Sequence, residues 1–211
     1  MFARSLFTEN MDIVHLCLQH PFVLGIASGK LQRDKFVYYM SQDAFYLTAY
    51  ARAFALGIAK SPDERAMRMF KSQVDATFEE LKLHQDYSKK WGFPLDVSPA
   101  KATLNYTNFL ERAAAFDDIS CIAAATLPCS ILYGYLGTEL SQQFDPKTPY
   151  KNWIDTYSST EFKAGTKVLE SLVNDYKTDE NKIKRHYRRA MELEYDFFDA
   201  AFKSTGISTA D

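Results

Sequence analysis

The spacing of apolar residues predicts helices along nearly the whole chain. Apolar side chains recur with the 3.6-residue period of a helix, and the strict alternation of a strand is almost absent. Most of the 8 glycines and 7 prolines fall between the periodic segments. The helices are expected at about 3–19, 33–60, 62–90, 98–116, 118–142, 149–156, 158–176 and 179–202, with a short helix or turn at 20–31. We therefore predict an all-α bundle of about eight helices that forms one domain over 1–211, with a frayed tail at about 204–211.

Several short motifs predict where these helices begin and end. "SPDE" at 61–64 predicts a helix start with Ser61 as the N-cap and Pro62 in the first position. "SSTE" at 158–161 is a second capping box. Gly29 can end the short helix before it. His20 precedes a proline and suits a capping role better than a catalytic one.

Three long helices carry a polar side chain within an apolar stripe. Asp43 lies in the aromatic stripe of 36–54, Cys129 in that of 122–136, and Glu194 in that of 187–201. A buried carboxylate without a partner costs several kcal/mol unless its pKa rises until it is neutral. Each carboxylate taken alone could pair with Arg, Lys or a Tyr hydroxyl, and Cys129 alone could be a structural thiol. Together they are the groups that nucleophilic and acid–base catalysis needs.

Composition narrows the possible partners. The net charge is −2 with mixed signs, so nothing indicates nucleic acid. The three cysteines have no framework spacing, which favours free thiols in a reducing compartment and hence a cytoplasmic protein. No apolar stretch is expected to reach the roughly 20 residues of a membrane span. Aromatic residues make up 15% of the chain, which fits either a large core or a pocket that stacks on a flat ligand.

A metal centre has weaker support. Glu80 and His84 are four residues apart on one predicted helix, and Glu79 adds a third polar group. They could form half of a dimetal site in a helical bundle, but the matching Glu-x-x-His pair is missing elsewhere.

Five collinear blocks resemble the TenA family, also called thiaminase II. They are "HPFV" at 20–23, "GKLQRDKFVYYMSQDAFYL" at 29–47, "LPCSILYGYLG" at 127–137, "WIDTYSSTEF" at 153–162 and "ELEYDFF" at 192–198. The resemblance covers about residues 5–203. It implies a haem-oxygenase-like helical fold, a homotetramer, and no metal or organic cofactor.

The resemblance also implies an activity and a set of site residues. The family hydrolyses 4-amino-5-aminomethyl-2-methylpyrimidine to the 5-hydroxymethyl compound with release of ammonia, and it cleaves thiamin into pyrimidine and thiazole. By position, the nucleophile falls on Cys129, the acid–base residue on Glu194 and the aspartate that holds the pyrimidine on Asp43. The pocket tyrosines fall on Tyr46, Tyr106, Tyr133 and Tyr157. Ser130 and Ala44 depart from common family residues, which could alter pocket shape or substrate preference.

Other functions remain open on the sequence alone. The same pocket could belong to a non-catalytic thiamin- or pyrimidine-binding regulator, which would bind its ligand without releasing ammonia. A helical dimetal oxidase of similar fold would contain metal after purification. A structural helical module would match its buried carboxylates with Arg or Lys.

Overall fold

The structure is a computed structural model that describes residues 1–205, and within these residues it contains ten helices and no strand. The predicted all-α class is therefore confirmed. The helices are α1 (Phe2–Glu9), α2 (Met11–Leu18), α3 (Pro21–Ser28), α4 (Arg33–Lys60), α5 (Glu64–Trp91), α6 (Lys101–Phe116), α7 (Ile119–Ser141), α8 (Lys151–Ser158), α9 (Thr160–Asp175) and α10 (Glu180–Lys203). The predicted tail begins just after α10, and its residues 206–211 lie outside the described residues.

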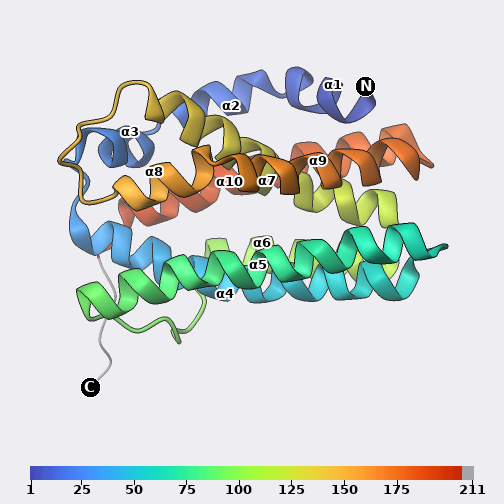
Figure 1. Ribbon diagram of the computed structural model, residues 1–211, viewed down its shortest axis with the longest axis horizontal. Helices are drawn as coiled ribbons and strands as arrows, with labels where there is room; N and C mark the ends of the chain where they lie inside the picture. The colour runs from blue at the N-terminus through green and yellow to red at the C-terminus, as the bar shows by residue number, and fades with distance from the viewer. Residues whose placement is uncertain (206–211) are drawn as a thin grey trace.

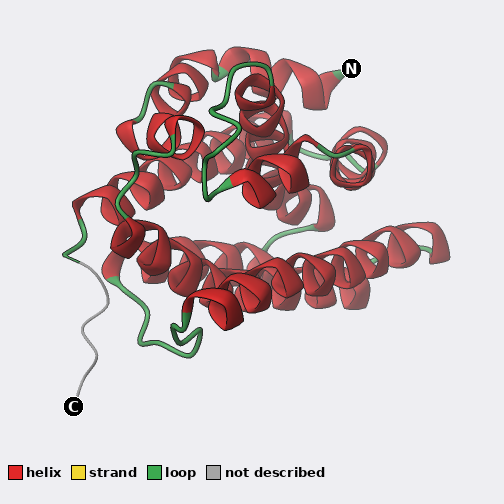
Figure 2. Ribbon diagram, turned by 60° about the vertical axis from the view of Figure 1, so that its left-hand side comes forward, coloured by secondary structure: helices red, strands yellow, loops and turns green. Residues whose placement is uncertain are grey.

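The helices form two layers, which Figures 1 and 2 show from two sides. Helix α4 packs against α5 and α6 in one layer. The other layer is built around α7, which contacts α8, α9 and α10, while α1, α2 and α3 lie along its outer side. Contacts of α6 with α7 and of α10 with α4 join the layers. Side chains from α4, α5, α7 and α10 therefore meet in the middle of the molecule.

Helix α7 is the most deeply buried element. By length and hydropathy it could cross a membrane, contrary to the expectation that no apolar stretch is long enough, but 89% of its most apolar window is buried inside the protein. Burial on all sides explains why it is apolar all round, as core helices are. Its start is capped by Asp118, whose carboxylate accepts from the backbone amides of Ser120 and Cys121.

Some helix ends differ from the prediction. The first helix is two, because the Asn10 side chain donates to the Leu6 carbonyl at 2.7 Å and interrupts the regular backbone there. Ser61 ends α4, and the N-cap of α5 is Asp63, which accepts from the amide of Ala66. The cap of α9 is Ser159.

Other ends follow the sequence closely. Gly29 ends α3 with φ of 69°, a left-handed conformation that glycine adopts without strain. His20 caps α3 by accepting from the amide of Phe22 at 3.2 Å. Helix α6 begins at Lys101, three residues after the predicted start.

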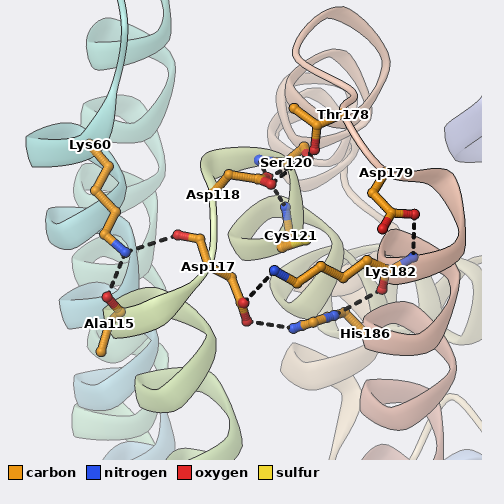
Figure 3. A network of polar contacts seen from close by, with 10 residues as sticks. All are labelled: Lys60, Ala115, Asp117, Asp118, Ser120, Cys121, Thr178, Asp179, Lys182 and His186. Atoms are coloured by element: carbon orange, nitrogen blue, oxygen red, sulfur yellow. Dashed lines mark hydrogen bonds and ion pairs between the residues drawn. The ribbon is translucent and has the colours of Figure 1, made fainter.

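A polar network ties α6, α7 and α10 together where α4 ends (Figure 3). The Asp117 carboxylate accepts from Lys182 at 2.7 Å and from His186 at 2.8 Å. Lys60 donates to the backbone carbonyls of Ala115 and Asp117. Although partial burial opposes it, these contacts from Lys182 and His186 hold the pKa of Asp117 below its usual value.

Candidate active site

Asp43 lies in the middle of α4 and is buried against α5. Its carboxylate contacts Nε2 of His84 at 2.8 Å, and Nδ1 of His84 lies 3.2 Å from the Glu80 carbonyl. Burial lowers the pKa of His84, but the hydrogen bond and charge of Asp43 outweigh it, so the pKa is raised. The partner of Asp43 is therefore a histidine, where Arg, Lys or a Tyr hydroxyl had been considered.

Glu194 comes from α10 and is 2% exposed. Its Oε1 accepts a hydrogen bond from the Tyr106 hydroxyl at 2.6 Å. Burial raises the pKa of Glu194 to about 8, although the Tyr106 contact lowers it, and the charges of Asp43 and Glu80 raise it further. Near neutral pH the Glu194 carboxyl group is therefore protonated in most of the protein molecules, and a general acid must be protonated before it can act.

Cys129 lies on α7 and its thiol is buried. Burial raises the pKa of the thiol well above its ordinary value, and the charges of Glu194, Glu80 and Asp43 act in the same direction. The Tyr46 hydroxyl lies close enough to favour the thiolate. The resting side chain is therefore a thiol, and it needs a base before it can attack.

Tyr46 is placed on the same side of α4 as Asp43. Its ring lies 4.6 Å from the ring of Tyr106. Its hydroxyl is buried near the Cys129 thiol and the Tyr106 hydroxyl, but within residues 1–205 it makes no hydrogen bond of normal geometry. A buried hydroxyl without a partner costs free energy, which a bound ligand with a polar edge would recover.

Tyr133 and Tyr157 pack edge to face with ring centroids 4.9 Å apart. The Tyr157 hydroxyl donates to Glu80 at 2.6 Å. Burial raises the pKa of Glu80 to about 7, the charge of Asp43 adds to it, and the Tyr157 contact opposes it. Tyr133 instead accepts a longer hydrogen bond of 3.3 Å from Tyr39.

A cavity of about 360 Å³ opens beside Cys129, between α5 of one layer and α8–α9 of the other. Of the seven residues expected at the site, only Cys129 forms part of its wall. Asp43, Glu194 and the four tyrosines do not line the cavity. The charges or hydroxyls of Asp43, Glu194, Tyr46 and Tyr133 act on or near the Cys129 thiol, Tyr106 is hydrogen-bonded to Glu194, and Tyr157 is hydrogen-bonded to Glu80. The structure thus brings all seven to one region.

Glu80 and His84 were not predicted from the sequence to bind other residues of the candidate site. Their spacing had suggested half of a metal site, but one holds Tyr157 and the other holds Asp43. Among residues 1–205, no group of three or more His, Cys, Asp and Glu side chains is arranged to hold a metal ion. The available signal was that both point from one face of α5 toward the core, which the amphipathic pattern of that helix could have indicated.

The chain is similar to known proteins over almost its whole length. A model of the TENA/THI-4/PQQC family matches residues 9–204. An aminopyrimidine aminohydrolase from Helicobacter pylori is 34% identical over 96% of this chain and 99% of its own length. A thiamine biosynthesis multifunctional protein from Corynebacterium efficiens is also 34% identical over 95% of this chain, which spans only 28% of that protein.

Solved structures agree on the fold. A TenA family transcription regulator from a Silicibacter species superposes with a TM-score of 0.90 at 26% identity, covering 97% of each chain. A domain with a haem-oxygenase-like fold from Shewanella denitrificans has a TM-score of 0.75 over 99% of this chain and 95% of its own, at 13% identity. At that identity the likeness shows the fold alone.

Proposed function

Because the chain belongs to the TENA/THI-4/PQQC family, we propose that it is an aminopyrimidine aminohydrolase of thiamin salvage. It converts 4-amino-5-aminomethyl-2-methylpyrimidine to the 5-hydroxymethyl compound and ammonia, and it also cleaves thiamin. The observation that carries the proposal is one buried thiol within electrostatic range of three carboxyl groups, two of which have pKa values raised to about 7 and 8. A purely structural core has no need of such a cluster.

The pyrimidine binds with its polar edge toward Asp43. The carboxylate accepts from the 4-amino group or pairs with a protonated ring nitrogen, a charge-assisted contact. His84 fixes the orientation of Asp43 through the 2.8 Å contact. The rings of Tyr46, Tyr106, Tyr133 and Tyr157 supply the flat walls, and the free Tyr46 hydroxyl supplies a further hydrogen bond.

The reaction uses Cys129 as nucleophile and Glu194 as acid and base. As the sulfur adds to the pyrimidine ring, its proton passes to an ionised carboxylate of the cluster. Protonated Glu194 gives its proton to the departing amine on the 5-methylene, and ammonia leaves. Water then adds to the methylene while Glu194 takes one of its protons. The adduct then collapses: the C–S bond breaks, the pyrimidine ring regains its aromatic bonding, and the released thiolate takes back the proton that the carboxylate of the cluster had accepted.

The test compares matched pairs of variants on the aminomethyl pyrimidine, with ammonia release as the measurement. Cys129→Ser should reduce kcat by at least about 1,000-fold. Cys121→Ser, at another buried cysteine of α7, should keep near-normal turnover. Undiminished turnover by Cys129→Ser would exclude the nucleophile assignment. Tight binding of the pyrimidine by the unaltered protein without any ammonia release would favour a binding regulator instead.

The resemblance to the family supports three further proposals. The protein acts as a homotetramer, it works in the cytoplasm, and its 211 residues form one domain. Sedimentation of the purified protein measures the first directly.

A further inference from the structure

The charged side chains in the wall of the cavity beside Cys129 are all negative. Three carboxylates, Glu79, Glu80 and Glu161, lie in its wall, and among residues 1–205 no Lys, Arg or His lines it. Glu79 and Glu80 come from α5, and Glu161 comes from the first turn of α9, so the two layers of the molecule both contribute. A cavity with a low-dielectric wall and charges of one sign attracts ions of the other sign.

The three carboxylates are only weakly neutralised by neighbours. Glu79 pairs with Lys82 at 2.5 Å, but both side chains are more than half exposed and such pairs contribute little. Glu80 accepts from the neutral Tyr157 hydroxyl, and because its pKa is raised to about 7 it is only partly ionised near neutral pH, so Glu79 and Glu161 carry most of the negative charge. Glu161 makes no ion pair within residues 1–205, and the partial positive charge at the start of α9 offsets only about half a unit of its charge.

The hydroxyl groups of the wall are largely engaged already. Ser130 is hydrogen-bonded to Thr166 at 2.7 Å. Ser159 accepts from the amide of Phe162 as the cap of α9. Thr77 donates to the carbonyl of Gln73 at 2.7 Å. Ser159 keeps its own O–H free, and the Gln73 amide also lines the cavity, so a phosphate group would find neutral donors there but no Lys, Arg or His among the described lining residues. A positively charged group would find carboxylates on two sides.

From this arrangement, and resting on the proposed function, we infer that the cavity is the leaving-group subsite and that it selects positively charged leaving groups over phosphorylated ones. Cys129 forms part of the cavity wall, whereas Asp43 is not among the residues that line the cavity and is paired with His84. With the pyrimidine edge at Asp43, the 5-methylene lies at Cys129 and the group attached to it projects into the cavity. The thiazolium ring of thiamin is a permanent cation and fits this charge. Its phosphate ester places a dianion among the glutamates.

The experiment compares cleavage of thiamin and of thiamin monophosphate by the purified protein. We expect kcat/KM for thiamin to exceed that for the phosphate by at least about tenfold at low salt, with the ratio falling as salt screens the carboxylates. Glu161→Lys should lower the ratio by at least about fivefold, because it places a cation in the wall. Glu64→Lys is the matched control, since Glu64 also lies in the first turn of a helix but outside this cavity. It should leave the ratio unchanged.

Three results would overturn the inference. They are equal cleavage of the two compounds, a ratio that Glu161→Lys and Glu64→Lys change equally, and no cleavage of thiamin by protein that hydrolyses the aminomethyl pyrimidine. In each of these, hydrolysis of the aminomethyl pyrimidine by the same preparation leaves the proposed aminohydrolase function standing, although the third result removes the proposed cleavage of thiamin. Loss of that activity as well in the unaltered protein would refute the proposed function, and the subsite with it. Circular dichroism of both lysine variants verifies that they are folded.

Discussion

Two histidine–aspartate pairs in this protein have the same distance between their nitrogen and oxygen atoms but lie among different charges. His84 and Asp43 are 2.8 Å apart at the candidate active site, and His186 and Asp117 are 2.8 Å apart in the network of Figure 3. Lys60, at the end of α4 in that network, is about 25 Å along the helix from Asp43, at 1.5 Å per residue. In the network, Lys182 adds a full positive charge beside Asp117. At the site, the nearby charges are further carboxylates, Glu80 and Glu194.

The positively charged side chains near each carboxyl group determine its pKa, and so whether it can exchange a proton near neutral pH. Asp117 keeps a lowered pKa and serves as an ionised anchor between helices. Within the described residues, the group that opposes the effect of burial on Glu194 is the neutral Tyr106 hydroxyl, so the pKa of Glu194 rises to about 8 and it can exchange a proton near neutral pH. The same chemical group is structural in one place and reactive in the other. Four measurements test this difference between the two regions.

The largest expected effect is on turnover. Glu194→Gln keeps the shape of the side chain but removes its proton exchange, so kcat for ammonia release should fall by at least about 100-fold. Glu192→Gln, two residues earlier on the exposed side of α10, should leave kcat within about twofold. Equal losses in the two variants would contradict the acid–base role.

The next effect is on stability at the other region. Asp117→Asn removes the charge that Lys182 and His186 contact, so the free energy of unfolding at pH 7 should fall by about 2 kcal/mol. Turnover of the folded protein should be unchanged, because the residue is remote from Cys129. Urea denaturation and a kcat measurement on one preparation check both statements. A large loss of kcat with unchanged stability would show that the two regions are coupled.

A smaller effect is expected from the two histidines. His84→Gln should raise KM for the aminomethyl pyrimidine by about tenfold with a minor change in kcat, because His84 orients Asp43 without touching the reacting atoms. His186→Gln makes the same change in the other pair and should leave KM unaltered. If kcat falls while KM stays constant in His84→Gln, His84 is not a positioning residue.

The smallest expected effect is on how stability varies with pH. The contribution of Glu194 to the free energy of unfolding should fall as the pH rises, and that of Asp117 should rise. Below pH 4.5 Glu194 is protonated in the folded and unfolded states alike. Between pH 4.5 and about 8 the unfolded state loses this proton and the folded state keeps it, so stability falls through this window. Glu194→Gln lacks this loss and should gain at least about 1 kcal/mol over the unaltered protein from pH 5 to pH 8.

Asp117 provides the reverse case. Its folded pKa lies below the ordinary 3.8, so its contribution is present above that pH and is lost as the pH falls through the lowered value. The stability deficit of Asp117→Asn should therefore shrink in strong acid. Thermal melts of both variants across pH detect the two trends. A deficit of Asp117→Asn that persists unchanged at the lowest pH would argue against an ionised anchor.

Much of the fold could be predicted because helix formation is local. The period of apolar residues gave the long helices α4, α5, α7 and α10 to within a few residues at each end. The predicted helix ends were wrong where two local signals in the sequence compete. At 61–64 both Ser61 and Asp63 can cap a helix, and the backbone chose Asp63 because Ser61 ends α4. At Asn10 a side-chain contact one turn back divides a pattern that reads as continuous.

Only some residues of the candidate site could be predicted from the sequence. Asp43, Cys129 and Glu194 stand out because each is a polar residue in an apolar stripe, and a stripe marks the buried face of a helix. Glu80 and His84 did not stand out as partners of Tyr157 and Asp43, since each pairing joins residues more than 40 positions apart. No periodicity within one helix can show which neighbour it will face.

The sequence by itself thus determined the helices, their buried faces and the three inward polar groups, because these depend on spacing within about four residues. Tertiary structure set the contact of Asp43 with His84 and that of Glu194 with Tyr106. It also placed no Lys or Arg from the described part of the chain in the wall of the cavity beside Cys129. These facts set the pKa values on which the proposed chemistry depends. Burial and neighbouring charge are properties of packed helices, and they exist only once the layers have come together.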